Sequence, residues 1–171
     1  MLTKIRKLRN GGFTLIELIV ALVIVGIIAA IASPSFVGLL NKVRVDTALE
    51  ELLGAIRETQ RLAMRHGKTC RINIDPNTNL INASDSECLL QERRLDDNVI
   101  VRTNLSGAIP NILFSHRGST TKMGTIVLSS NLTNSQKCFV ISLGLGIMRT
   151  GEYTGSNTGS VSASNCQSEQ T

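Results

Sequence analysis

The longest apolar stretch of the chain runs from Phe13 to Ala32, and Glu17 is its only charged residue. Apart from Glu17 this run has no polar face, so it predicts a helix surrounded by lipid or by other apolar helices. A carboxylate in such surroundings costs roughly 2.5–3.5 kcal/mol on membrane-insertion scales. Glu17 therefore needs a functional reason and a partner for its charge.

After Pro34 the pattern becomes amphipathic, because apolar residues recur at steps of three and four over residues 36–63. We expect one helix from about Phe13 to His66, with Gly67 as its stop signal. The proline in the middle of this helix removes a hydrogen bond. It predicts a kink, or a segment that bends when the protein moves from one environment to another.

From Lys68 onward, apolar and polar positions alternate with a period of two, and turn residues separate the alternating segments. Short strands at this spacing predict antiparallel sheet. The fold class is therefore α+β, with a long N-terminal helix packed on a small antiparallel β-sheet head. The expected strands are 69–75, 80–83, 98–103, 112–115, 125–129, 138–143 and 147–150, with an edge strand at 161–166 in an otherwise irregular polar tail.

The net charge of +5 belongs mostly to the first residues of the chain, where Lys4, Arg6, Lys7 and Arg9 precede the apolar run. Basic residues before an apolar run favour retention of that end in the cytoplasm. Aromatic residues make up only 3% of the chain, which argues against a stacking platform for single-stranded nucleic acid. The charge therefore indicates a membrane orientation signal rather than a nucleic-acid surface.

Two ordinary explanations of this N-terminus remain open. A secretory signal peptide would use residues 18–28 as its hydrophobic region and residues 30–32 as a cleavage site, so the mature chain would begin at Ser33. A simple signal anchor would keep the whole run, which is long enough to span about 30 Å of hydrocarbon.

Neither explanation accounts for the order GFTLIE at residues 12–17. This stretch resembles the processing site of type IV prepilins and of type II secretion pseudopilins. The resemblance implies that a prepilin peptidase cuts after Gly12 and that the new N-terminal residue, Phe13, is methylated. It also implies the type IV pilin-like version of the α+β fold, and Pro34 agrees with it because pilins commonly carry a proline at this distance from the cut.

The resemblance also supplies a partner for Glu17. Cleavage leaves an ammonium group on Phe13, and in a filament Glu17 of one subunit can pair with that group on another subunit. Removing either charge leaves the other uncompensated, at roughly 3–5 kcal/mol. The pair would act mainly as a register device that admits a subunit at one axial offset.

The head is similar to that of the FimT/GspH-type minor pilins and pseudopilins. The similarity rests on the segments AIRETQRLA (55–63), FSHRG (114–118) and GTIVL (124–128). These motifs are less specific than the N-terminal one. They imply a long helix packed on two small antiparallel sheets.

The combined resemblance implies four regions. They are a cleaved leader (1–12), a transmembrane and filament-core helix half (13–35), an amphipathic helix half (36–67) and a periplasmic head with a polar tail (68–171). The protein would cross the inner membrane once before assembly and would lie in an extracellular pilus afterwards.

The four cysteines all follow the apolar run, as expected for a domain that reaches an oxidising compartment. Four cysteines allow three connectivities. Local spacing favours Cys70–Cys88, which flank a turn, together with Cys138–Cys166, which would tie the polar tail to a strand.

Catalysis finds no support in the sequence, and we expect no enzyme activity, no metal and no cofactor. His66 and His116 are far apart, so a zinc site is not indicated. The carboxylate pairs of the chain are more typical of solvated helix and loop positions than of acid–base catalysis.

DNA binding is a separate hypothesis, because some FimT-type pilins contact DNA through a glycine followed by two arginines one residue apart. The matching positions here are GIMR (146–149), in which Ile147 replaces the first arginine and Arg149 matches the second. Arg117, Lys122, Lys137 and Arg149 would form a modest basic patch if the fold brought them together. A scattered, solvated set of charges is the favoured interpretation.

The sequence therefore predicts a minor pilin that is incorporated into a type IV pilus, helps to initiate it, and supports pilus biogenesis, motility or DNA uptake. Its partners would be the prepilin peptidase, the inner membrane and other major and minor pilins. The alternatives are a minor pseudopilin of a type II secretion system, a DNA-binding competence pilin, and an exported disulfide-bonded protein. The polar tail and the lack of an obvious calcium cage slightly favour a pilus.

Overall fold

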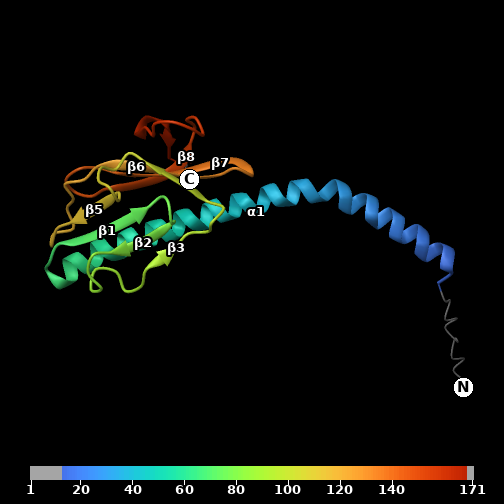
Figure 1. Ribbon diagram of the computed structural model, residues 1–171, viewed down its shortest axis with the longest axis horizontal. Coiled ribbons are helices and arrows are strands. Elements are labelled where there is room, and N and C mark those ends of the chain that lie inside the picture. Colours follow the sequence, from blue (N-terminus) through green and yellow to red (C-terminus); the bar gives the residue numbers. More distant parts are fainter. Residues whose placement is uncertain (1–12, 169–171) are drawn as a thin grey trace, which may run out of the picture. The chain divides into compact units, whose positions relative to one another are not determined.

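The computed structural model of the protein describes residues 13–168, without the side chains of residues 31–35 (Figure 1). The chain divides into two compact units, Met1–Phe36 and Val37–Thr171, and helix α1 (Leu15–His66) contributes to both. In the first unit, α1 is the only described element. The second unit combines the rest of α1 with all of the strands.

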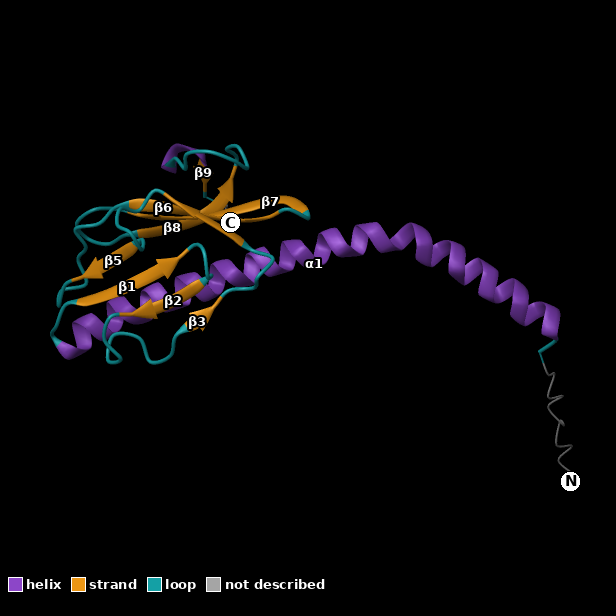
Figure 2. Ribbon diagram, in the orientation of Figure 1, coloured by secondary structure: helices purple, strands orange, loops and turns teal. Residues whose placement is uncertain are grey.

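The strands form two antiparallel sheets (Figure 2). The four-stranded sheet has the order β3-β2-β1-β5, and the five-stranded sheet has the order β4-β6-β7-β8-β9. The strands are β1 (Cys70–Asp75), β2 (Leu80–Ala83), β3 (Arg93–Arg94), β4 (Ile100–Thr103), β5 (Asn111–Phe114), β6 (Gly124–Ser130), β7 (Thr133–Ile141), β8 (Met148–Tyr153) and β9 (Cys166–Gln167), with a short 3-10 helix at Ala163–Asn165.

The main core lies between α1 and both sheets. Leu52 and Ile56 of α1, Ile72 of β1, Phe114 of β5 and Phe139 of β7 are all completely buried in it. Because helix residues three and four apart share a face and strand residues two apart share a face, one apolar stripe on α1 can cover both sheets. The predicted α+β architecture is confirmed.

Helix α1 ends at His66 as the sequence predicts, and Gly67 explains why. Gly67 has a φ of 65°, a left-handed conformation that glycine adopts without strain. The Lys68 amide then donates to the Ala63 carbonyl at 3.2 Å, which is the closing bond of a Schellman motif. The chain thereby leaves the helix and enters β1 directly.

The five-stranded sheet is buried on both faces. Its second face carries a smaller apolar cluster that includes Val127, Val140, Tyr153 and Val161, so the polar tail covers this face. The Tyr153 hydroxyl accepts a hydrogen bond from the Ser162 amide at 3.2 Å. The tail is therefore packed on the sheet although it has little apolar surface of its own.

Several strand predictions differ from the structure. β8 extends to Tyr153 rather than ending at residue 150. β7 begins at Thr133 rather than at residue 138, because its polar first half pairs with the end of β6. The strand expected at residues 161–166 is wrong: Ala163–Asn165 form a 3-10 turn capped by Ser162, and only Cys166–Gln167 pair with β8. β3 was missed, because two residues show no periodicity.

A long-range ion pair explains why β3 forms. Arg93 Nη2 donates to Glu58 Oε2 at 2.5 Å, and Arg93 Nη1 donates to the Glu51 carbonyl at 3.2 Å. Both acceptors lie on α1, so the strand is held by the helix as well as by its pairing with β2.

Both favoured disulfides are present. Cys70 and Cys88 join the start of β1 to the loop after β2, and Cys138 and Cys166 join β7 to β9. The second bridge closes the smaller core, since both of its cysteines belong to that cluster.

Replacing Cys138 and Cys166 together by serine is expected to lower the free energy of unfolding by about 2–4 kcal/mol, because the unfolded chain gains entropy. The tail should also become sensitive to protease, since it loses its covalent tie to β7. Denaturant titration and limited proteolysis measure the two effects. In the matched control, Cys70→Ser with Cys88→Ser, stability should fall while the tail stays protected. Equal protection of the tail in both variants would contradict this account.

Candidate functional site

The N-terminus of α1 is capped by Thr14. Its hydroxyl accepts a hydrogen bond from the Glu17 amide at 3.3 Å, and its carbonyl accepts the first helical bond from Leu18 at 3.2 Å. Thr14 and Glu17 thus occupy the first and last positions of a T-x-x-E capping box, a motif that sets a helix start. Glu17 also lies in the first helical turn, where the helix dipole stabilises a negative charge.

The apolar side chains of this first helical segment are exposed. Phe13 is 83% exposed, Leu15 is 81% exposed and Ile28 is still 62% exposed. Exposed aliphatic side chains lie on every face of this helical segment. A helix that is apolar all round is normally buried. This segment therefore lacks the surroundings that its sequence requires, and another molecule must supply them.

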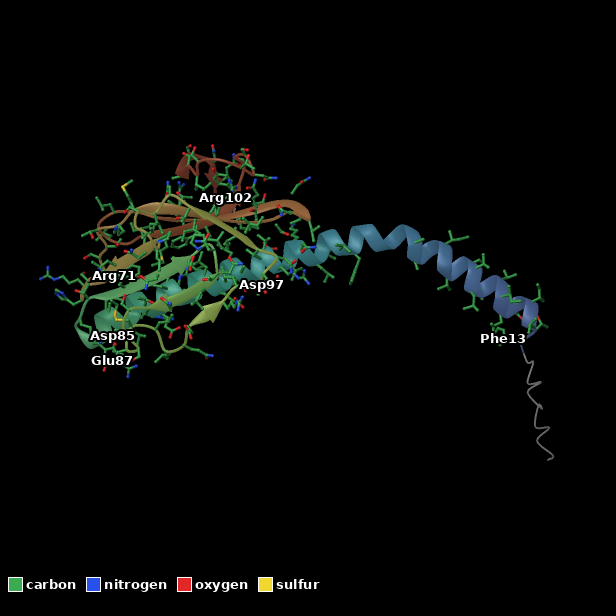
Figure 3. All side chains as sticks on the ribbon, viewed as in Figure 1. Phe13, Arg71, Asp85, Glu87, Asp97 and Arg102 are labelled. Atoms are coloured by element: carbon green, nitrogen blue, oxygen red, sulfur yellow. A yellow bond between two sulfur atoms is a disulfide. The ribbon has the colours of Figure 1, made fainter. Side chains whose placement is uncertain are left out.

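Glu17 is the one charged side chain in this exposed apolar segment, over residues 13–30. Within residues 13–168, no group forms a hydrogen bond or ion pair with its carboxylate; only its main-chain amide is paired. Phe13, which the sequence assigns to processing and assembly, lies one residue before the cap (Figure 3). The structure therefore leaves the charge of Glu17 available for a partner outside the chain.

Two assigned positions lie wholly or partly outside the described residues. Gly12, together with the rest of the leader 1–12, lies outside the described residues. Pro34 lies within the backbone of α1, but its side chain belongs to the part that is not described, so the predicted kink is untested. Among the helical residues that the structure describes, no stretch is both long and apolar enough to qualify as a membrane span.

The four cations proposed as a DNA-binding patch do not share one surface. The Lys137 side chain is only 8% exposed, and its Nζ lies 3.5 Å from Asp46 Oδ1 of α1 and 3.4 Å from Glu152 Oε1 of β8. Lys137 therefore faces α1. Arg149 is opposite Val140 in the β7–β8 register, so it lies on the other face of the sheet, where its Nη2 donates to the Ala163 carbonyl.

The other two candidates, Arg117 and Lys122, lie in the loop between β5 and β6. Arg117 is exposed, and Lys122 Nζ donates to Ser106 Oγ at 2.9 Å. Including Lys137 in the patch was wrong, because a lysine held between two carboxylates is not available to phosphates. The replacement of the first motif arginine by Ile147 also weakens the DNA-binding hypothesis, because it removes a second cation that could contact phosphates.

Chemistry-bearing side chains do not converge elsewhere in the described part of the chain. No group of three or more histidine, cysteine or acidic side chains is arranged to hold a metal ion in residues 13–168. His66 and His116 are both exposed, and all four cysteines are in disulfides.

Sequence families place both parts of the chain. Residues 7–33 match the family described as the prokaryotic N-terminal methylation motif. Residues 48–145, more than half of the chain, match the family described as type II transport protein GspH. The chain belongs to the GspH family. The resemblance to type IV pilin-like proteins of the GspH type is therefore confirmed, and so is the pilin-like fold.

Other comparisons add two observations. The structure is similar to that of the minor pseudopilin EpsH from the type 2 secretion system of Vibrio cholerae, with 14% sequence identity and a TM-score of 0.47, over 66% of this chain and 96% of that one. The comparison with curated proteins found no match.

Sequence reasoning missed two features of this GspH-family member. The cap at Thr14 could have been found, because T-x-x-E before an apolar run is a known helix-start signal. The role of Lys137 could not, because its carboxylate partners lie far away in the sequence, on α1 and β8.

A second ionic cluster lies just after α1. Lys68 Nζ donates to Asp85 Oδ2 at 2.6 Å and also contacts Glu87 Oε2. The hydrogen bond from Lys68 lowers the pKa of Asp85 below its ordinary value of 3.8, and the bonds to Asp85 and Glu87 raise the pKa of Lys68. The cluster holds the loop that the Cys70–Cys88 disulfide closes.

The pKa of Asp85 predicts how this cluster responds to acid. A carboxylate with a lowered folded-state pKa adds stability above its unfolded pKa, and that stability is lost as pH falls through the folded value. We therefore expect Lys68→Met to be less stable than the wild type at neutral pH, with a difference that shrinks below pH 3.8. Denaturant titrations across this range measure it. Lys42→Met, at a lysine without an ion pair among the described residues, is the control, and its difference should not depend on pH. An equal effect of pH on both variants would refute the linkage.

Proposed function

We propose that this chain is a minor pseudopilin of a type II secretion system, processed by a prepilin peptidase and added to a short filament with other pilin-like subunits. The observation that carries the proposal is the presence of both parts on one chain. An N-terminal methylation motif precedes a head of the type II transport GspH family. Each part alone is compatible with several roles, but together they favour a secretion pseudopilus.

This proposal replaces the pilus that the sequence favoured. The polar tail and the absence of an obvious calcium cage were weak arguments, because the tail lies outside both matched segments, residues 7–33 and 48–145, and an absence carries little weight. The family of the head is described by type II transport, which fits the secretion alternative better than a pilus-specific role.

The N-terminal segment would act by burying its apolar side chains against neighbouring helices. Each leucine, isoleucine or valine side chain that is exposed in the single subunit and becomes fully buried in the filament would contribute about 1.5–3 kcal/mol to association. Burial would also remove the Glu17 carboxylate from water, which is unfavourable unless a positive charge accompanies it. The ammonium group of Phe13 on a neighbouring subunit would be that charge, so only a correctly offset neighbour would be accepted.

The proposed pseudopilin would have the four regions that the sequence indicates. Residues 1–12 would be removed, residues 13–35 would anchor the subunit in the inner membrane before assembly, and residues 36–67 would support a periplasmic head. The two disulfides suit this placement, because they form and persist in an oxidising compartment. The head would be non-catalytic and would supply contacts to other subunits.

Mass spectrometry of the protein isolated from its native membrane tests the processing step. The proposal expects a chain that begins with N-methylated Phe13. A chain that begins at Ser33 would show cleavage by ordinary signal peptidase and would overturn the proposal, because the mature protein would then lack Glu17.

Replacing Glu17 by alanine is expected to abolish incorporation into filaments. An unpaired buried ammonium group costs roughly 3–5 kcal/mol, which corresponds to more than about a hundredfold loss of incorporated subunit. Quantitative immunoblotting of sheared filaments measures it. The control is Glu92→Ala, which removes an exposed carboxylate from a loop of the head and should leave incorporation unchanged. Normal incorporation of the Glu17 variant would eliminate the pairing mechanism.

A further inference from the structure

One end of the head is built from three segments that lie far apart in the sequence. They are the last turns of α1 (residues 57–66), the β5–β6 loop (115–123) and the β7–β8 loop (142–147). Gln60 Nε2 donates to the Gly118 carbonyl at 2.8 Å, and main-chain bonds of 2.8 Å and 2.9 Å join Thr120 to Gly144 in both directions. A β-carbon at Gly146 would lie 3.0 Å from the Gly118 oxygen, so the two loops also pack closely. We call this continuous surface the helix-end surface.

Arginines border the helix-end surface. Arg57, Arg61 and Arg65 recur at four-residue steps along one side of α1, and all three are exposed, as is Arg117 of the β5–β6 loop. Arg61 follows the helix residue that contacts this loop, and Arg117 precedes the loop residue that receives the contact. The two loops add no carboxylate, because no aspartate or glutamate occurs from residue 98 to residue 151.

The carboxylates at this end of the head have other partners. Glu58, on the same turns of α1, pairs with Arg93. Asp85 and Glu87, which Figure 3 shows at the end where α1 stops, both pair with Lys68. The four arginines form no ion pair with a residue in the range 13–168. Like charges four residues apart repel each other, so the chain itself gains nothing from the arginine stripe.

Exposed aliphatic side chains accompany the arginines. Leu145 and Ile147 of the β7–β8 loop are 78% and 61% exposed, so their side chains project from the surface. Leu143 of the same loop is 59% exposed, and Met64, at the end of α1, is 46% exposed. Met64 lies against the β5–β6 loop, because a β-carbon at Gly118 would be 2.8 Å from its sulfur.

The β7–β8 loop is ordered although its aliphatic side chains face water. The Ser142 amide donates to the Ile147 carbonyl at 3.0 Å, and the bonds between Gly144 and Thr120 fix the centre of the loop. Leaving apolar side chains in water contributes nothing to the stability of the single chain. A surface that is already ordered, however, loses little entropy when it binds.

This combination of side chains suits an anionic lipid surface. Guanidinium groups stay charged and bind phosphate oxygens in a bidentate manner. Projecting aliphatic side chains can enter the boundary between headgroups and acyl chains, where lipids adapt to their shape. A protein partner would need a hollow that matches Leu145 and Ile147, and a nucleic acid offers no apolar region to them.

We propose that the helix-end surface docks on a membrane that contains anionic phospholipid. The β7–β8 loop inserts at the level of the headgroups, and Arg57, Arg61, Arg65 and Arg117 bind lipid phosphates. This contact is separate from the N-terminal apolar segment, because the second unit of the chain supplies all of its residues. It rests on the proposed function only for its setting, a periplasmic head enclosed by membranes.

Fluorescence quenching tests the docking on the full-length chain, held in vesicles of phosphatidylcholine. A fluorophore is attached to one added cysteine, either at Thr121→Cys in the β5–β6 loop or at Asn131→Cys in the β6–β7 turn, both exposed positions. The native cysteines do not compete for the label, since all four are in disulfides. Second vesicles carry a quencher on their lipids. They contain either phosphatidylcholine alone or equal parts of phosphatidylcholine and phosphatidylglycerol.

The label at Thr121→Cys should be quenched by the anionic vesicles and not by the neutral ones, and the label at Asn131→Cys by neither. The label reports only the lipid close to it, so binding of the basic residues 4–9 to the second vesicles does not interfere. Added salt should weaken the quenching, because it screens the attraction of the arginines to the lipid.

Two double variants separate the charged and the apolar contributions. Arg61→Gln with Arg117→Gln should weaken vesicle binding at least about tenfold, because two cations leave the lipid surface. Leu145→Ser with Ile147→Ser should have an effect of similar size, because two side chains no longer leave water. The matched controls are Lys42→Gln and Leu132→Ser, an exposed lysine and a 57% exposed leucine away from the helix-end surface. Both should bind like the wild type, and circular dichroism checks that each variant is folded.

Equal quenching by neutral and anionic vesicles would overturn the docking, and so would equal quenching of the two labels. Wild-type binding by both double variants would overturn it as well. Binding of duplex DNA without any binding of vesicles would assign the arginines to nucleic acid instead. A processed, methylated Phe13 together with any of these results would refute the docking while leaving the proposed function intact.

Discussion

The structure depends on an apolar helix that the chain itself cannot cover. The side chains of residues 13–30 are exposed, and the Glu17 carboxylate has no partner among the described residues. Burying these side chains is favourable, whereas burying the carboxylate is unfavourable until a positive charge joins it. In the proposed filament, the same segment would drive association and also make it conditional. A filament of like-built subunits satisfies both demands at once.

The head is built to remain folded while α1 is shared between two tasks. Its core packs one apolar stripe of α1 against two small sheets. The Glu58–Arg93 ion pair joins β3 to the helix. The Cys138–Cys166 bridge holds a tail that has little apolar surface of its own. Because these devices lie within the head, the exposed side of α1 stays available for neighbours.

The charges of the head show how position changes the meaning of a residue. Lys137 resembles a surface cation in the sequence, but it lies between Asp46 and Glu152 and stabilises the packing of α1 on the five-stranded sheet. Arg61 and Arg117 are exposed and have no ion-pair partner among the described residues. The family of the head fits the proposed role in assembly.

The sequence alone determined the features that depend on neighbours along the chain. These were the processing motif at residues 12–17, the extent of α1 with its stop at Gly67, most strand positions, and a disulfide pairing inferred from local spacing. Tertiary structure decided the two-residue strand at Arg93–Arg94, the turn that replaced the expected strand at 161–166, and the faces of Lys137 and Arg149. Alternation along a strand shows which residues share a face, but it carries no information about what packs opposite that face. That depends on contacts between segments far apart in the chain, which only the folded arrangement of α1 and the two sheets brings together.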